Sequence, residues 1–324
     1  MPTTTTASPA PLLAGDALVA RLRGTPGERP LVDPGLAGGL RDWLEDELSG
    51  AVAGLPEEAG PVRISKEAVN GVLVCEAQLV AARAGRPGPT VQLARGSMVD
   101  ALFRQWVTVG RIDDPVADAL EALEVQGDPD GIVAFVGGLA GEERRALAAE
   151  VADHTERIRS AWPVLPASWL ARTQERMVVP LAGGRVVLSG VVDLALGAPS
   201  GGRASVCVVE VKSGRRRVEH RADLHLYALL ETLRSGAPPF RVATFYTAGG
   251  ELDVEPVGRD ALLGALHRVV AGTLRLVRLA AGAAPVPTPN PLCGWCPALA
   301  GCDPGLARVA ETAGAPADGA LACR

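Results

Sequence analysis

The stretch from 186 to 212, VVLSGVVDLALGAPSGGRASVCVVEVK, decides how this chain is expected to fold. Two apolar runs, at 185–196 and 204–212, flank a turn rich in glycine, and this pattern predicts two antiparallel strands. Asp193 lies in the first run, and Glu210 and Lys212 lie in the second. Strands this apolar are expected to be covered on both faces, so charged side chains there cost free energy unless they bind a metal or one another.

The three charged residues are expected to meet. Alternation along a strand places Glu210 and Lys212 on one side, about 6.6 Å apart along the axis, and the hairpin brings Asp193 alongside. Two carboxylates from neighbouring strands form a hard oxygen site suited to Mg²⁺ or Mn²⁺. A lysine beside that site can orient or help deprotonate a water for attack on phosphorus. The alternative is a structural Glu210–Lys212 salt bridge, because Glu-x-Lys alone is a weak pattern.

Further elements are expected on both sides of this pair. They are helices at 36–54, 66–80 and 96–109, several helices between 114 and 161, a strand at 177–181, a helix at 218–234, a strand at 242–247 and a helix at 260–280. The order predicts an α/β protein with a central mixed sheet flanked by helices and with a helical N-terminal part.

Composition sets the boundaries of the functional hypotheses. The 324 residues carry a net charge of −5, which counts against a nucleic-acid binder, although a local basic groove can lie on an acidic protein. Only Lys66 and Lys212 are lysine among 32 basic residues. The pKa of lysine can shift, whereas arginine cannot lose its proton. A lysine in a chain that otherwise uses arginine is therefore a candidate functional residue. No apolar run is long enough to span a bilayer and no signal peptide is evident, so we expect a cytoplasmic protein without membrane contact.

Changes in amino-acid composition along the chain predict three parts. Residues 1–60 are expected to form a partly disordered leader and an N-terminal helix. Residues 61–305 are expected to form one domain with a helical insertion at about 111–161. An Ala- and Gly-rich tail, 306–324, is expected to be mobile.

Three cysteines cluster near the end of this domain. Cys293, Cys296 and Cys302 form the pattern C-x2-C-x5-C, and Cys75, 218 positions before Cys293, is the best candidate for a fourth ligand. This spacing alone fits zinc and an iron–sulfur cluster about equally. Cys207 lies in an apolar strand and is expected in the core.

Basic residues and histidines give weaker signals. Residues 203–221 hold six basic and two acidic residues, and four of the arginines could bind backbone phosphates or simply be solvated: Arg215, Arg216, Arg217 and Arg221. His154 and His267 are expected at the surface of helices, whereas His220 and His225 follow the Glu-x-Lys strand closely. No phosphate-binding P-loop is present, so any helicase motor would be another chain.

Gly190-x-x-Asp193, Glu210-x-Lys212 and a following helix with Tyr227 resemble the PD-(D/E)XK nuclease superfamily. The resemblance is closest to the RecB-like exonuclease branch with an iron–sulfur cluster, which includes CRISPR-associated and AddB-type nuclease domains. Glu175 matches a glutamate that precedes the Asp strand in this branch. Two positions depart from the pattern: Asp223 replaces the glutamine of Gln-x-x-x-Tyr, and Asp100 replaces the metal-binding histidine of Gly-x-x-x-His.

The resemblance implies a restriction-endonuclease-like core and hydrolysis of DNA, single-stranded or at duplex ends, with Mg²⁺ or Mn²⁺. It implies metal ligation by Asp100, Asp193 and Glu210. Lys212 would assist the water, and Glu175 and Tyr227 would support the site. It also implies a 4Fe–4S cluster, with zinc as the alternative, on the four cysteines: Cys75, Cys293, Cys296 and Cys302. A separate helicase subunit could be a partner.

The departures at Asp100 and Asp223 favour a second hypothesis, an inactive domain that binds DNA or a protein. A third is a zinc protein without nuclease function.

Overall fold

The computed structural model describes residues 15–85, 88–199 and 202–314. Within these residues the chain divides into two compact units, each assembled from three segments. Of the described residues, unit 1 comprises 15–39, 88–177, 191–199 and 202–263, and unit 2 comprises 40–85, 178–190 and 264–314. The strand segments 172–181 and 186–196 each contribute residues to both units, and the single domain expected at 61–305 stays a prediction.

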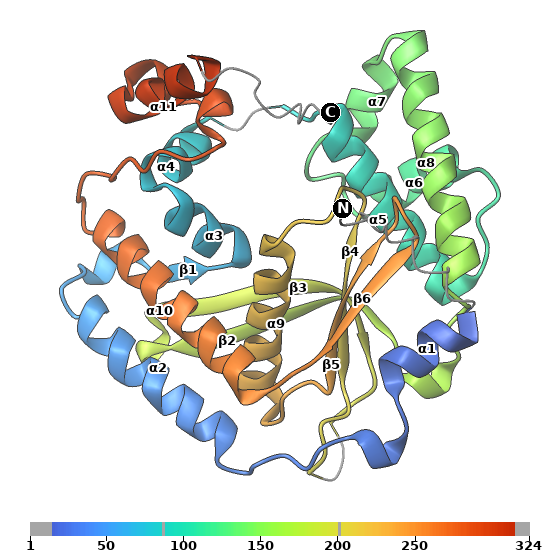
Figure 1. Ribbon diagram of the computed structural model, residues 1–324, viewed down its shortest axis with the longest axis horizontal. Helices are drawn as coiled ribbons and strands as arrows, with labels where there is room; N and C mark the ends of the chain where they lie inside the picture. The colour runs from blue at the N-terminus through green and yellow to red at the C-terminus, as the bar shows by residue number, and fades with distance from the viewer. Residues whose placement is uncertain (1–14, 86–87, 200–201, 315–324) are drawn as a thin grey trace, which may run out of the picture. The chain divides into compact units, whose positions relative to one another are not determined.

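The strands of the described residues form one mixed sheet in the order β1-β3-β4-β5-β6, with β2 paired with β3 (Figure 1). Their bounds are Val62–Ile64 (β1), Arg172–Leu181 (β2), Val186–Leu196 (β3), Cys207–Lys212 (β4), Arg241–Tyr246 (β5) and Glu251–Pro256 (β6). The sheet and its flanking helices confirm the predicted α/β class, and β3 and β4 are the predicted hairpin. The short strand β1 and the edge strand β6 were not predicted.

The register of unit 1 aligns the charged residues of the sheet. β3 and β4 are antiparallel with Leu194 opposite Val209, so Asp193 and Glu210 are next in line. β4 and β5 are parallel, and Lys212 lies opposite Tyr246. Paired residues project to the same face of a sheet, so the charged ends of β3 and β4 share a face with alternate residues of β5.

The helices of unit 1 lie on both faces of this sheet. They are α1 (Gly15–Arg23), α5 (Val91–Val109), α6 (Pro115–Val125), α7 (Ile132–Gly138), α8 (Gly141–Ala161) and α9 (Glu219–Ser235). Helix α9 packs against β4 and β5, and α1 packs against β5 and β6. Helices α6 to α8 pack with α5 around an apolar cluster of their own, in agreement with the several helices predicted between 114 and 161.

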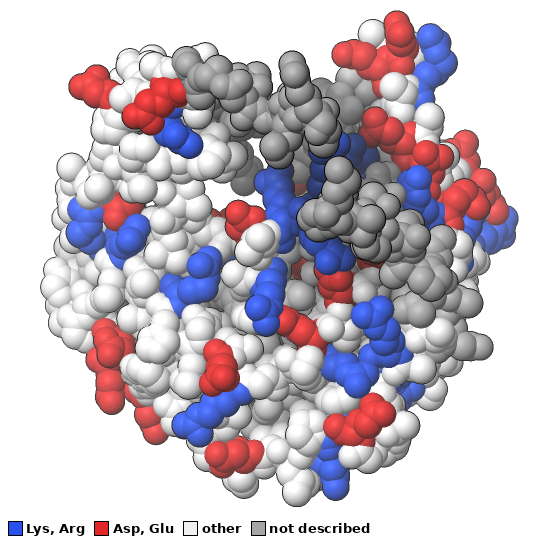
Figure 2. Space-filling model, viewed as in Figure 1, with Lys and Arg blue, Asp and Glu red and all other residues white. Residues whose placement is uncertain are grey.

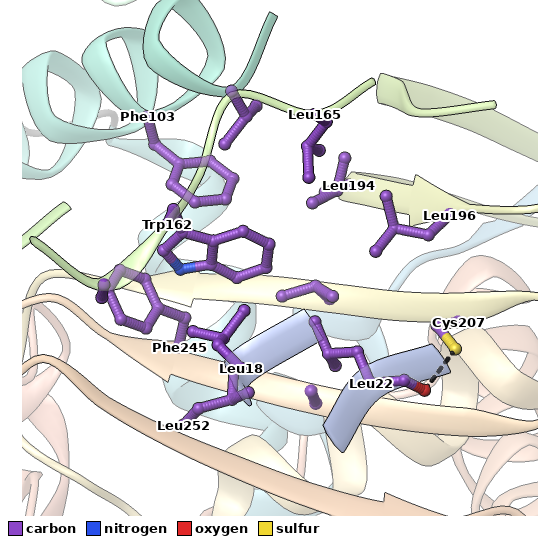
Figure 3. Close-up of a cluster of buried hydrophobic side chains, with 14 of the residues drawn as sticks. Leu18, Leu22, Phe103, Trp162, Leu165, Leu194, Leu196, Cys207, Phe245 and Leu252 are labelled. Carbon is purple, nitrogen blue, oxygen red and sulfur yellow. Dashed lines mark hydrogen bonds between the residues drawn. The ribbon is translucent and has the colours of Figure 1, made fainter. Parts of the chain in front are cut away.

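The main core of unit 1 is built around three aromatic rings. Trp162 meets Phe103 and Phe245 edge to face, with ring centroids 5.1 and 5.6 Å apart (Figure 3). Cys207 lies in the same core, and its thiol donates to the carbonyl of Leu22 at 3.0 Å. Burial raises the pKa of this thiol to about 11, so it stays protonated. The core position predicted for Cys207 is confirmed.

Unit 2 contains α3 (Lys66–Val74), α4 (Glu76–Ala84), α11 (Asp303–Gly314) and most of α2 (Leu36–Val52) and α10 (Arg259–Ala280). The single helix predicted at 66–80 is wrong, because the chain breaks at Cys75. This residue has an extended backbone, with φ −164° and ψ 118°, and it ends α3 and begins α4. The break frees Cys75 from the helical repeat and points the chain toward the cysteine-rich segment.

The C-terminal segment is more ordered than the sequence indicates. Helix α11 occupies residues 303–314, where a mobile tail was expected from 306, because it packs against the short turns that carry Cys293 and Cys302. Cys323 lies outside the described residues. Among the described residues, none of the helices is both long and apolar enough to span a membrane.

Candidate active site

Asp193, Glu210 and Lys212 meet where β3 and β4 run side by side. The Lys212 ammonium donates to Glu210 Oε1 at 2.6 Å. Glu210 is only 2% exposed, so this ion pair is shielded from bulk water on the carboxylate side. Asp193 Oδ2 accepts the backbone N–H of Val211 at 2.7 Å, which fixes the aspartate against the neighbouring strand. The hairpin thus brings the three charged groups together, as its pattern predicted.

These groups line a cavity of about 360 Å³ in unit 1. Asp100, on α5, reaches the same cavity, although it is 93 positions before Asp193 in the chain. Ser213 and Gly214, which follow β4, complete its rim. Three carboxylates and one ammonium therefore converge on one concave site, a combination that suits binding of a hard cation beside a phosphate.

Asp100 carries strong electrostatic constraints. Its Oδ2 forms an ion pair with the guanidinium of Arg104, one turn along α5, at 3.1 Å. Burial raises the pKa of Asp100, the Arg104 guanidinium opposes that rise, and the negative charge of Glu210 adds to it. The influence of Glu210 on Asp100 shows that the helix and the sheet contribute to one electrostatic site.

Gln174 is a site residue that sequence reasoning missed. Its Nε2 donates to Asp193 Oδ1 at 3.2 Å and to Asp100 Oδ2 at 3.3 Å, so one amide joins the two carboxylates. Gln174 lies within β2 with φ 51°, a left-handed conformation that is unusual for a non-glycine residue. No motif marks this position, and its only signal is adjacency to Glu175.

Glu175 and Tyr227 lie apart from this group. Glu175 forms ion pairs at 2.9 Å with Arg172 and with Arg234, and Arg234 also pairs with Glu231 at 2.6 Å. Tyr227 is buried on α9. Neither residue is among the described residues that line the cavity, so their catalytic roles stay predictions.

Two histidines of unit 1, His154 and His220, are hydrogen-bonded to residues at the end of β5. His154 is 5% exposed, and its Nδ1 is hydrogen-bonded to Thr247 Oγ1 at 2.8 Å, so the prediction of a surface histidine is wrong. It is buried because α8 packs close to the end of β5. His220 Nδ1 is hydrogen-bonded to the Tyr246 hydroxyl at 3.1 Å. Burial lowers the pKa of His220, and the nearby Lys212 charge lowers it further.

The arginines after β4 lie on two sides of the candidate site. Arg216 pairs with Asp253 at 2.7 Å and Arg221 pairs with Glu255 at 2.7 Å, both across to β6. Arg216, Arg217 and Arg221 line a cavity of about 550 Å³, whereas Arg215 lines a separate cavity of about 300 Å³. In Figure 2 basic side chains gather where β4 leads into α9. This local charge agrees with the predicted basic surface.

No group of three or more His, Cys, Asp or Glu side chains in the described part of the chain is arranged ready to hold a metal ion. At the sheet the donor chemistry fits a divalent cation, since Asp100, Asp193 and Glu210 offer oxygen ligands around one cavity. Their oxygens are bonded instead to Gln174, Arg104 and Lys212. A cation would have to replace some of these contacts.

The four predicted cysteine ligands lie together in unit 2. Cys75, Cys293, Cys296 and Cys302 line one narrow pocket with room for only about 10 Å³. Backbone N–H groups donate to two of the sulfurs, from Thr288 to Cys75 and from Asn290 to Cys293, each at 3.3 Å. Such N–H···S contacts stabilise thiolates, so the donor set suits a soft metal. The four sulfurs thus converge on one enclosed site.

The model of the PD-(D/E)XK nuclease superfamily matches residues 63–303, a range that contains every candidate ligand described above. The chain belongs to the PD-(D/E)XK nuclease superfamily. Nucleases of this superfamily generally use divalent metal ions such as Mg²⁺ or Mn²⁺. Membership supports nuclease activity for this PD-(D/E)XK protein, and it agrees with the fold expected from the motif.

Two solved structures resemble this PD-(D/E)XK chain only distantly. A protein from Eubacterium rectale, named as a candidate exonuclease, is 13% identical with a TM-score of 0.45, over 73% of this chain and 87% of that one. The protein SSO0001 is 14% identical with a TM-score of 0.35, over 80% of this chain and 93% of that one. No curated protein matches the chain.

Proposed function

We propose that this chain is a metal-dependent deoxyribonuclease that hydrolyses phosphodiester bonds, working inward from DNA ends. The observation that carries the proposal is the convergence of Asp100, Asp193, Glu210 and Lys212 on one cavity. Membership of a nuclease superfamily supports it independently of the geometry. The exonucleolytic mode rests on the resemblance of the motifs to the RecB-like branch.

Asp193, Glu210 and Asp100 are the residues that would hold the cation. When bound, a divalent ion supplies stabilisation of the negative charge that develops on the phosphate. Asp193 is well suited to this role because Val211 N–H holds one oxygen in place while the other faces Gln174. Gln174 would release its two carboxylates as the cation enters, or would turn its amide so that the carbonyl oxygen faces the cation.

Lys212 would act on the substrate side of the site. Its ammonium is held by Glu210 at 2.6 Å and remains partly exposed toward the cavity. From there it can orient the attacking water by hydrogen bonding and offset charge on a phosphate oxygen. The Glu210 contact fixes the direction of the long, flexible lysine side chain, which reduces the entropy lost on substrate binding.

An activity assay separates this role from a purely structural ion pair. We expect wild-type protein to degrade labelled single- and double-stranded DNA with Mn²⁺, and Lys212→Ala or Asp193→Ala to lower the rate by about 100-fold or more. Asp303→Ala, an acidic residue in unit 2, is the matched control and should leave the rate unchanged. Equal rates in the wild type and both site variants would end the proposal. Product length from end-blocked substrates reports the exonucleolytic mode.

The four cysteines are proposed to hold a structural 4Fe–4S cluster, with a single zinc ion as the alternative. The RecB-like resemblance supports the cluster, whereas four thiolates around one site also suit a single zinc ion. Hydrolysis needs no electron transfer, so either group would act by linking segments of unit 2. Iron, sulfide and zinc analysis after anaerobic purification decides between the two.

A catalytically inactive domain that binds DNA or a protein is the second candidate. It is favoured by Asp100, which stands where a metal-binding histidine is usual and is engaged by Arg104 and Gln174. Absence of cleavage together with measurable DNA binding would support this candidate over the first.

The cellular setting is proposed from the resemblance alone. A nuclease of this branch would act in DNA repair, recombination or defence, in the cytoplasm, and a separate helicase subunit would supply any unwinding. A pull-down with the tagged chain, followed by an ATPase assay on the captured material, tests the helicase partner.

A further inference from the structure

A second cavity in unit 1, of about 550 Å³, lies beside the candidate active site. Four arginines line it together with an aromatic ring and an apolar strand residue, and we call it the arginine pocket: Arg21, Arg216, Arg217, Arg221, Tyr246 and Val254. Its volume lies in the range of pockets that hold small organic ligands. None of the metal-binding candidates lines it, so it is a distinct site.

Charge in the arginine pocket favours an anion. Four guanidinium groups face two carboxylates, Asp253 and Glu255, on a chain whose net charge is −5. The two carboxylates are paired with Arg216 and Arg221 at 2.7 Å and hold those side chains in place. Among the described residues, Arg217 forms no ion pair, so its charge remains available to an incoming group. The arginine fork binds phosphate through paired hydrogen bonds, as it binds carboxylate.

Apolar and aromatic surface lies next to this charge. Val218, at the start of α9, is 90% exposed and lines the pocket, as do Leu224 and Val254. The Arg216 guanidinium lies over the Tyr246 ring, 5.4 Å from its centre, so the two form a cation–π pair at the wall of the pocket. A ligand with both a phosphate and a flat, partly apolar ring matches these two halves, and a nucleotide has both.

The position of the arginine pocket relates it to the proposed catalytic step. Tyr246 is paired with Lys212 in the register of β5 and β4, and neighbouring strands lie about 4.8 Å apart. His220 is hydrogen-bonded to Tyr246 and lies near the Lys212 charge. A strand of DNA with a phosphate at Lys212 would therefore place an adjoining nucleotide at the arginine pocket.

We propose that the arginine pocket binds one nucleotide of single-stranded DNA next to the bond that is cut. The phosphate of that nucleotide contacts Arg217 and Arg21, and the base packs on Val218 beside the Arg216–Tyr246 pair. The pocket thus favours an unpaired strand, because a base inside a duplex must first unstack and unpair, at a cost in free energy, before it can enter. This assignment rests on the proposed nuclease function but is tested separately by binding.

The test measures fluorescence anisotropy of fluorescein-labelled dT12, with Ca²⁺ in place of Mg²⁺ to prevent cutting. We expect Arg217→Ala to raise Kd about tenfold and to reduce the slope of log K against log salt by about 1. Val218→Ser should raise Kd about threefold or more without changing the slope, because it removes base packing and not charge. Arg144→Ala, an exposed arginine on α8, is the control.

Wild-type Kd and salt slope in both pocket variants would overturn the assignment. A duplex of the same length that binds as tightly as dT12 would also overturn it.

Cleavage assays with Mg²⁺ keep this result apart from the proposed function. If wild type cuts and Asp193→Ala does not, while the pocket variants bind like wild type, the nuclease stands and the pocket falls. If neither the wild type nor Asp193→Ala cuts DNA but the pocket variants lose binding, the pocket assignment stands and the nuclease proposal falls. Unchanged melting temperatures exclude misfolding of the variants.

Discussion

The side-chain amide of Gln174 holds two acidic groups of unit 1 together. Its hydrogen bonds to Asp100 and Asp193, at 3.3 and 3.2 Å, offset the repulsion between carboxylates that share a cavity. The left-handed backbone of this residue, with φ 51°, costs on the order of 1 kcal/mol or more. The surrounding strand must compensate for that cost, which is typical of residues at functional sites.

Replacing Gln174 is expected to change stability in a manner that depends on metal. Gln174→Ala removes the donor between Asp100 and Asp193, so the metal-free protein should lose about 1–3 kcal/mol of stability. Added Mn²⁺ should stabilise the variant more than the wild type, because the cation then replaces the lost donor. Thermal melts with and without Mn²⁺ measure both effects, with Gln92→Ala, in the same cavity, as control. Equal Mn²⁺ shifts in the variant and the wild type would contradict this role.

His154 should make folding stability sensitive to mild acid. Burial lowers its pKa in the folded state, and the charges of Arg95 and Arg157 lower it further. Above about pH 6.5, the ordinary value, His154 is neutral in both states and its full contribution is present. As the pH falls from about 6.5 toward the lower folded pKa, only the unfolded chain gains the proton readily, so stability is lost over this range.

Urea denaturation between pH 5 and 8 measures this effect. We expect His154→Gln, which can keep the hydrogen bond to Thr247, to flatten the pH profile on its acidic side. His267→Gln, at an exposed position, should leave the profile of the wild type unchanged. A profile that is as steep in His154→Gln as in the wild type would assign the acid sensitivity to other groups.

Among the elements, α5, β5 and the segment after α8 are joined by the Phe103–Trp162–Phe245 cluster (Figure 3). These rings bring α5 to the sheet and so set where Asp100, on the same helix, meets Asp193. Edge-to-face packing contributes beyond burial alone. The Trp162 indole N–H is buried and finds no hydrogen-bond partner within the described part of the chain, so packing against the neighbouring rings is what holds the tryptophan here.

Truncation of Trp162 is expected to loosen the attachment of α5. Trp162→Ala should lower the free energy of unfolding by about 3–5 kcal/mol, because it leaves a large cavity. Trp162→Phe should cost less than half of that, since it keeps a ring and removes an unpaired N–H. Urea denaturation followed by circular dichroism measures both changes. A loss as large in Trp162→Phe as in Trp162→Ala would mean that the indole makes a specific contribution.

At the scale of the whole molecule, the four cysteines of the narrow pocket belong to unit 2 although they span most of the sequence. Joining Cys75 to Cys293 closes a very long loop of chain, which removes much conformational freedom from the unfolded state. The stabilising effect of a metal group there should be concentrated in unit 2, where α11 packs on the cysteine-rich turns, α4 lines the cysteine pocket and α3 packs on α4.

Hydrogen exchange can locate that effect. Cys293→Ser is expected to reduce amide protection in α3, α4 and α11 while β4 to β6 keep theirs. Cys207→Ala is the reciprocal control, because it removes a core thiol of unit 1 and should affect the strands instead. Uniform loss of protection in the Cys293 variant would show that the two units unfold as one.

The sequence alone determined the hairpin and the family. Alternation of apolar and charged residues within 186–212 is a local property, so it placed Asp193, Glu210 and Lys212 on paired strands without reference to the rest of the chain. The cysteine spacing likewise identified the residues that line one pocket. Both signals depend on short separations or on a rare residue type, and such signals survive without tertiary information.

Tertiary structure alone decided what surrounds that hairpin. The amide of Gln174, the pairing of Glu175 with Arg172 and Arg234, and the burial of His154 all arise from contacts between elements. The break at Cys75 and the arginine pocket are of the same kind. A side chain's partners are set by packing across the sheet and its helices, and spacing along the chain does not encode that packing. The charged stretch that defined the fold therefore named three catalytic candidates, and the folded chain supplied their environment.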